Sequence, residues 1–120
     1  MPKETSLANL SEDLQSTSKE LLGECDELTK AAREYANREN AYRMARAKAM
    51  LEAPKDTVDM KKAFVDSVTE KERLAAHVSE GLLDATRERV RSLRAVLSAL
   101  QTIAGSYKAE ADFSRTGPRF

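Results

Sequence analysis

Basic side chains gather on both sides of Pro54, and phosphate binding is the chemistry that they fit. Before the proline, Tyr42-Arg43-Met44-Ala45-Arg46-Ala47-Lys48 places three cations on one broad helical face. Basic groups near a helix C-terminus are also favoured by the macrodipole alone, so a purely structural role is the competing interpretation. Two further lysines follow the proline and extend the basic patch. The predicted nucleic-acid-binding residues are Arg43, Arg46, Lys48, Lys61 and Lys62.

Residues for catalysis or metal binding do not occur in a convergent pattern. His77 is the only histidine and Cys25 the only cysteine, whereas a zinc or nucleophilic site needs several donors at fixed spacing. The four glycines are scattered, so there is no phosphate-binding glycine loop. We therefore expect no enzyme, no catalytic residues, no metal and no cofactor, with Cys25 acting as a small core residue.

The composition is typical of long helices rather than of a compact globule. Among 120 residues, 33% are charged and 5% are aromatic, and no alternating apolar pattern or hairpin dipeptide predicts a strand. The net charge is zero, but residues 1–34 carry eight acidic and four basic groups, whereas residues 35–50 carry four basic groups and one acidic group. Such asymmetry can steer an anionic partner although the sum vanishes.

Pro54 divides the expected helices. The first helix is predicted over about residues 7–52, with an N-terminal arm before it. Residues 53–68 are predicted as a linker or a short helix capped by Thr57, with Met60, Phe64 and Val68 on one face. Thr69-Glu70-Lys71-Glu72 is a capping-box sequence, so a new helix or a bend is expected at Thr69, the alternative being an unbroken helix from Thr57.

The second long helix is predicted over about residues 69–111, which makes residues 1–111 one helical-hairpin domain. Residues 112–120, which contain Gly117 and Pro118, are predicted as a flexible tail, with single-strand contact or docking to a partner as the alternative. The apolar stripe of the first helix runs Leu7, Leu10, Leu14, Leu21, Cys25, Leu28, Ala32, Tyr35, Tyr42, Ala45 and Ala49. That of the second runs Leu74, Val78, Leu82, Val90, Leu93, Val96, Leu97, Leu100, Ile103, Ala104 and Tyr107.

These spacings of three, four and seven predict an all-α fold, with two long helices in an αα-hairpin or coiled coil. A hairpin places Glu24, Asp26 and Glu27 near the second helix at about Leu93. The arginines expected beside this acidic patch are Arg87, Arg89, Arg91 and Arg94. Two helices alone bury little surface, so we expect assembly into a homo-oligomer.

The segment after Glu39 carries a family resemblance. Arg46-Ala47-Lys48 is followed by Ala49-Met50-Leu51-Glu52, then by a polar linker, a lysine-containing segment, and a stretch of small and apolar residues over 93–103. This order, over residues 39–111, resembles the UvsY-type recombination mediators and small helical proteins encoded near recombination genes in tailed phages. The linker here is not glycine-rich, unlike that of the mediators.

The resemblance implies a closed homo-oligomer that binds single-stranded DNA, with Arg46 and Lys48 as the DNA-contacting pair. It also implies assistance in loading a recombinase or annealing protein in the presence of single-strand-binding protein. Two alternatives stay open: a helical adaptor or inhibitor of a host enzyme, which places residues 24–34 on a basic partner, or a structural coiled-coil component. No apolar run approaches a membrane span, and a cytoplasmic protein is expected, in the host cell if it is phage-encoded.

Overall fold

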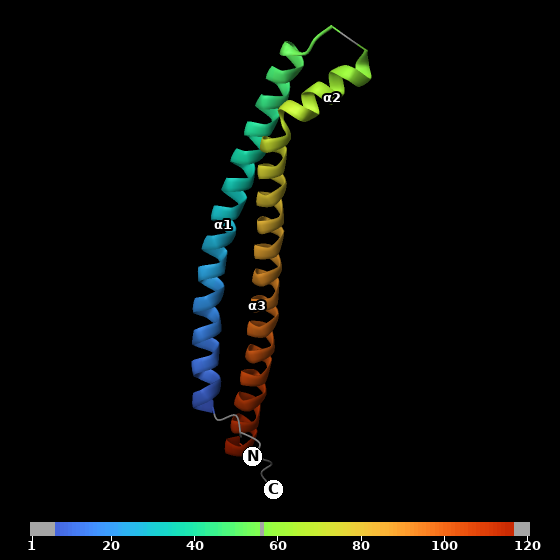
Figure 1. Ribbon diagram of the computed structural model, residues 1–120. Coiled ribbons are helices and arrows are strands. Elements are labelled where there is room, and N and C mark those ends of the chain that lie inside the picture. Colours follow the sequence, from blue (N-terminus) through green and yellow to red (C-terminus); the bar gives the residue numbers. More distant parts are fainter. Residues whose placement is uncertain (1–6, 56, 117–120) are drawn as a thin grey trace, which may run out of the picture. The chain divides into compact units, whose positions relative to one another are not determined.

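The computed structural model describes residues 7–55 and 57–116, which form three helices and no strand. These are α1 (Leu7–Glu52), α2 (Val58–Val68) and α3 (Glu70–Thr116). The long helices α1 and α3 lie side by side and run in opposite directions (Figure 1). The predicted all-α fold with two packed long helices and a short helix between them is confirmed, while the homo-oligomer stays a prediction.

The helix ends follow the residues that cannot continue a helix. α1 ends at Glu52, two residues before Pro54, as predicted. α3 ends at Thr116 and not near residue 111, so the expectation of a flexible tail from residue 112 is wrong for 112–116. Nothing in that stretch opposes helix formation, and Gly117-Pro118 is the first strong breaker. Residues 1–6, predicted as an arm, and 117–120 lie outside the described residues.

The chain separates into two compact units, and each is described by itself. Unit 1 comprises Met1–Cys25 with Glu88–Phe120, and unit 2 comprises Asp26–Arg87. The expectation of one domain over residues 1–111 stays a prediction.

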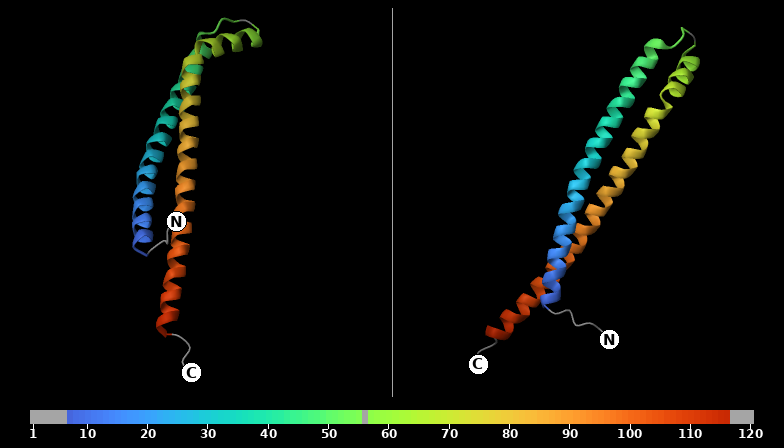
Figure 2. Two further views of the ribbon diagram at one scale, coloured as in Figure 1. Left: turned by 60° about the horizontal axis from the view of Figure 1, so that its bottom comes forward. Right: turned by 60° about the vertical axis from the view of Figure 1, so that its left-hand side comes forward.

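In unit 1, α1 contributes the fully buried Leu10, and both views of Figure 2 show the two helices adjacent, with α3 extending past the start of α1. Leucines supply most of the facing surfaces. The half-buried ones are Leu14, Leu21, Leu93, Leu97 and Leu100.

One predicted interhelical ion pair forms in unit 1. The Arg89 Nε donates to Glu24 Oε2 at 3.1 Å, which joins the acidic patch of α1 to the basic patch of α3. Arg91 instead pairs with Glu88 on its own helix, at 2.6 Å. The predicted neighbourhood of the acidic and basic patches is therefore confirmed at this pair, whereas the predicted register, with Glu27 opposite Leu93, would place Glu24 opposite residue 96.

In unit 2, α3 turns a different face inward from the predicted one. Leu74, Val78 and Leu82 are 48%, 61% and 61% exposed, so their prediction as core residues is wrong. The buried residues here are Thr69, which directly precedes α3, and Ala76, Ser79, Leu83 and Thr86 of α3. Together with the half-buried Glu72, these residues are spaced alternately three and four positions apart. Residues with this spacing form one continuous seam along a helix, and that seam packs on the partner helix. Leu74, Val78 and Leu82 are always four positions apart, so they drift away from a seam that needs alternating steps of three and four.

Small hydroxyl side chains are tolerated in this seam because their hydrogen bonds stay within the helix. Ser79 Oγ donates to the carbonyl of Ala76 at 2.9 Å, and Thr86 Oγ1 donates to that of Leu82 at 2.8 Å. No hydroxyl is therefore left without an acceptor on burial. Small side chains also let two helices approach closely.

α2 also differs from its predicted face. Val65 is buried, whereas Met60 and Val68 are 59% and 51% exposed, so the predicted Met60–Phe64–Val68 stripe is not the buried one. Only Phe64 of that stripe is half-buried. α2 and α3 meet at Thr69, whose Oγ1 donates to the Val65 carbonyl at 2.6 Å. Thr69 therefore ends α2. A new helix, a bend and an unbroken helix were the possibilities expected at Thr69, and the structure has a new helix, α3, beginning at Glu70.

Candidate nucleic-acid interface

The short helix α2 brings two lysines back to the end of α1. Thr57 caps it, accepting a hydrogen bond at Oγ1 from the Met60 backbone N–H at 3.3 Å. Asp59 in the first turn adds a favourable charge at the helix N-terminus. Lys61 ends the first turn of this helix and Lys62 begins the second.

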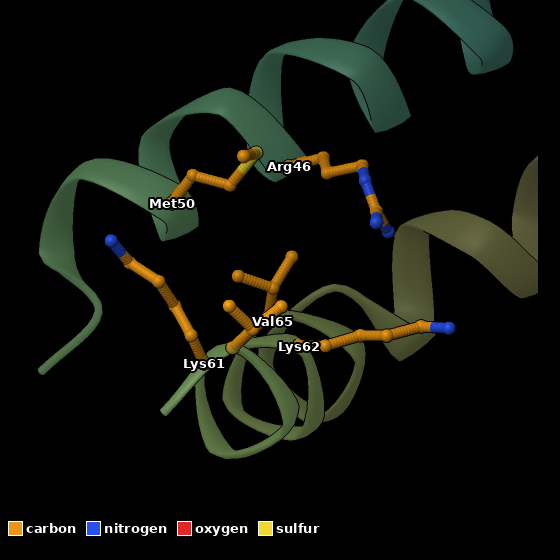
Figure 3. Close-up of a pocket in the computed structure, with 6 residues that line it drawn as sticks. Arg46, Met50, Lys61, Lys62 and Val65 are labelled. Atoms are coloured by element: carbon orange, nitrogen blue, oxygen red, sulfur yellow. The ribbon is translucent and has the colours of Figure 1, made fainter. Parts of the chain in front are cut away.

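A groove forms where α1 and α2 meet in unit 2. Its volume is about 250 Å³, and it is lined by Arg46, Met50, Val58, Lys61, Lys62 and Val65. Figure 3 shows Lys61 on one side of Met50 and Val65, with Arg46 and Lys62 on the other. The groove therefore has an apolar floor between cations that come from two helices.

Three of the five predicted nucleic-acid-binding residues meet in this groove, namely Arg46, Lys61 and Lys62. Arg43 and Lys48 lie on α1 but do not line it. The apolar floor of Met50, Val58 and Val65 was not predicted as part of the site. Its only signal in the sequence is the seven-residue spacing of the two valines, which places them on one side of a helix.

Arg46 is held by two partners. Its Nη1 donates to Asp66 Oδ1 of α2 at 3.2 Å and to the Tyr42 hydroxyl at 3.4 Å. The bond to Tyr42, and then that to Asp66, raise the pKa of Arg46 above its usual value. The guanidinium is therefore a fixed cation, and the Tyr42 hydroxyl helps to orient it.

The other two predicted DNA-binding cations of α1, Arg43 and Lys48, pair with acids on their own helix. Arg43 Nε lies 3.2 Å from Glu39 Oε1, and Lys48 Nζ lies 4.0 Å from Glu52 Oε1. Exposed pairs of this kind are worth about 0.3–0.5 kcal/mol, so a stronger anion can displace the carboxylate.

Lys61 and Lys62 differ from them, because neither forms an ion pair with any described residue. Lys61 is half-buried at the groove, and Lys62 is exposed. Their ammonium groups are thus the cations of the groove that an incoming phosphate meets without first displacing the carboxylate of a described residue.

Other chemistry finds little support among the described residues. His77 is exposed on α3, and no group of three or more histidine, cysteine or acidic side chains within 7–55 and 57–116 is arranged to hold a metal ion. None of the helices in the described part of the chain is long and apolar enough to cross a membrane.

The basic groove of unit 2 is therefore the candidate site. No protein-family model, no curated protein and no solved structure matches the chain, so the case for a function rests on its own residues.

Proposed function

We propose that this chain is a non-enzymatic accessory protein that binds single-stranded DNA through the groove between α1 and α2. The observation that carries the proposal is that Arg46, Lys61 and Lys62 line one groove with an apolar floor, and that neither lysine forms an ion pair with a described residue. Proteins that bind single strands without sequence preference combine cations for the backbone with apolar surfaces for the bases.

Each part of the groove has a distinct role in this proposal. Lys61 and Lys62 contact phosphates, and Arg46 contacts a phosphate after exchanging Asp66 for it. Met50, Val58 and Val65 present apolar surface to a base or sugar. Lacking an aromatic platform, this floor gives weak and sequence-blind contact, so charge supplies most of the affinity.

A single groove with three cations binds a strand weakly, so we propose that the protein acts as a homo-oligomer. Repeating the groove makes the second and later contacts intramolecular, which raises the overall affinity without new chemistry. The resemblance to recombination mediators supports the role of such a particle, which is to help a recombinase or annealing protein load in the presence of single-strand-binding protein.

The experiment that tests the site is an anisotropy titration of labelled oligo-dT with a Lys61→Ala/Lys62→Ala variant. Its affinity is expected to fall about tenfold or more at low salt. The salt slope is expected to fall by about 1.4, since each lost phosphate contact on a single strand removes about 0.7. Lys19→Ala/Lys108→Ala is the control, because it removes the same charge from two exposed positions of unit 1. Equal losses in both variants would contradict the assignment.

A helical protein–protein adaptor is the second candidate, and one observation favours it. Arg43, Arg46 and Lys48 all have carboxylate partners, so they need no phosphate to balance their charge. Under this alternative the parent protein leaves oligo-dT unbound even at low salt, where phosphate contacts are strongest.

A further inference from the structure

The junction between α2 and α3 contains a capping motif that is not closed. In a closed capping box, the hydroxyl of the first residue accepts the N–H of the residue three positions on, whose carboxylate accepts the N–H of the first. Thr69 and Glu72 have the residue types and the spacing for this exchange. Instead, the N–H and the Oγ1 of Thr69 both donate to the Val65 carbonyl, at 3.0 and 2.6 Å. Thr69 therefore caps the end of α2 and not the start of α3.

This arrangement leaves Glu72 with an unsatisfied oxygen. Its Oε2 is buried and has no hydrogen-bond partner among the described residues. A buried carboxylate oxygen in this state has lost its contact with water and gained no donor, which costs free energy. The donor that a capping box would give the carboxylate is the N–H of Thr69, and Val65 accepts that N–H here. A second arrangement of the same residues would supply the missing donor.

Thr57 shows the conformation of a working cap in the same chain. Its backbone is extended, with φ −61° and ψ 157°, and its Oγ1 accepts the N–H of Met60, three residues on. Thr69 has φ −103° and ψ 9°. Its φ already suits extended backbone, so a rotation about ψ alone separates it from the conformation of a capping residue. Threonine is β-branched, and residues of this kind favour extended backbone.

A rotation about ψ of Thr69 turns α2 relative to α3. α2 carries both lysines of the basic groove, whereas the arginine of the groove lies on α1. Two contacts hold α2 in the observed position: Val65 is buried, and Asp66 Oδ1 lies 3.2 Å from Arg46 Nη1. Release of these contacts opens the groove, and closure of the capping box offsets part of the loss.

We infer that Thr69 is a hinge with two capping states. In the observed state it caps the end of α2, and the groove is formed. In the second state it caps the start of α3 together with Glu72, and α2 swings away from α1. The hinge follows from the junction alone. Its use, which is to admit a DNA strand and close on it, rests on the proposed function, because a strand that bridges the two helices favours the state in which they meet.

The distance between α1 and α2 tests the hinge. Nitroxide labels are placed on Ala47→Cys of α1 and Ala63→Cys of α2, both exposed and outside the groove, in a Cys25→Ser background. Labelled chains are diluted with unlabelled ones, so that double electron–electron resonance reports distances within one chain. Two distances are expected, and the longer one belongs to the swung-out state. A single distance would overturn the inference.

Variants of Glu72 test whether the capping box forms the second state. Glu72→Met and Glu72→Ala remove the acceptor, and each is expected to lower the ratio of long to short distances about fivefold, the usual effect of losing a helix cap. The two differ in size, so a packing defect would not be common to both. Helical circular dichroism is expected to be retained, because the buried oxygen has no partner to lose.

Glu72→Gln is the matched control, because a glutamine amide oxygen also closes a capping box. Its ratio of long to short distances is expected to equal the parent's. A ratio that stays unchanged in Glu72→Met and Glu72→Ala would overturn the inference. A loss in Glu72→Gln as large as theirs would also overturn it, since the charge and not the cap would then be responsible.

Oligo-dT separates the hinge from its proposed use. Added to the labelled parent at low salt, it is expected to shift the ratio toward the shorter distance. Two distances that oligo-dT leaves unchanged would contradict the use of the hinge by DNA and preserve the hinge itself. A single distance in a protein that binds oligo-dT would overturn the hinge and preserve the DNA-binding proposal.

Discussion

At the scale of single residues, the existing ion pairs determine which cations of unit 2 a phosphate reaches first. Arg46 has its charge shared with Asp66, whereas Lys61 and Lys62 have no described carboxylate partner. A phosphate that approaches the groove therefore meets two cations that no described carboxylate neutralises, and the carboxylate of Asp66. The carboxylate opposes binding both by repelling the phosphate and by occupying Arg46.

Asp66→Asn is expected to tighten the binding of oligo-dT about two- to fivefold at low salt, because a unit charge about 4 Å away contributes up to about 1 kcal/mol in a water-like medium. Anisotropy titration measures this change. Asp59→Asn removes the same charge from another exposed site on α2, outside the groove, and serves as the control. A tighter binding that is equal in both variants would show a general charge effect and no role for the Asp66–Arg46 pair.

Tyr35 reports on the acidic groups around it in unit 2. Glu80 first, then burial, Glu39 and Asp84, raise the pKa of its phenol, against the lowering effect of Arg43. A pKa raised in the folded state favours folding below the unfolded pKa of about 10, and this contribution is lost as pH rises through the folded pKa.

Glu80→Gln is therefore expected to lower the pKa of Tyr35 toward its usual value. The measurement is the ultraviolet absorbance of the phenolate during an alkaline titration of a Tyr42→Phe/Tyr107→Phe background, in which Tyr35 is the only tyrosine. An unchanged titration midpoint would show that Glu80 does not act on this phenol.

At the scale of elements, the burial of each leucine in α1, rather than its residue type, sets how much it contributes to the free energy of unfolding. Leu10 is 1% exposed and Leu22 is 69% exposed. Leu10→Ala is expected to lower the free energy of unfolding by about 2–5 kcal/mol, and Leu22→Ala by about 0.5 kcal/mol or less. Urea unfolding followed by circular dichroism, at one protein concentration, measures both. Similar losses in the two variants would contradict the inward face assigned to the start of α1.

The ends of the elements were more predictable from sequence than their inward faces. Pro54 and Thr57 mark the end of α1 and the start of α2 by backbone chemistry that neighbouring residues do not alter. The inward face of α3 in unit 2 was predicted wrongly, because hydrophobicity selected Leu74 and Leu82 over Ser79. The hydrogen bond from Ser79 to its own helix, which permits burial, has no signature in the sequence.

The candidate site was also predictable only in part: the sequence indicated which cations meet, but not how they are paired. The turn at Pro54 is short, so cations on either side of it had to lie near each other, and Arg46 does meet Lys61 and Lys62. The pairing of Arg46 with Asp66 was not predictable, because it depends on the direction in which α2 leaves the turn. The same direction decides that Val65 forms part of the floor.

At the scale of the whole molecule, the charge balance determines how DNA binding can arise. With 20 basic and 20 acidic residues, the protein has no net attraction for a polyanion. Under the proposed function, binding depends on the local groove and on its repetition in an assembly, and the phosphate contacts weaken as salt rises.

The most direct test of the account is an anisotropy titration of labelled oligo-dT with the full chain at low and moderate salt, after light scattering has fixed its mass. The account predicts salt-sensitive binding by an oligomer, and a loss of that binding in Lys61→Ala/Lys62→Ala but not in Lys19→Ala/Lys108→Ala. Absence of binding at low salt would contradict the central claim and favour a protein partner.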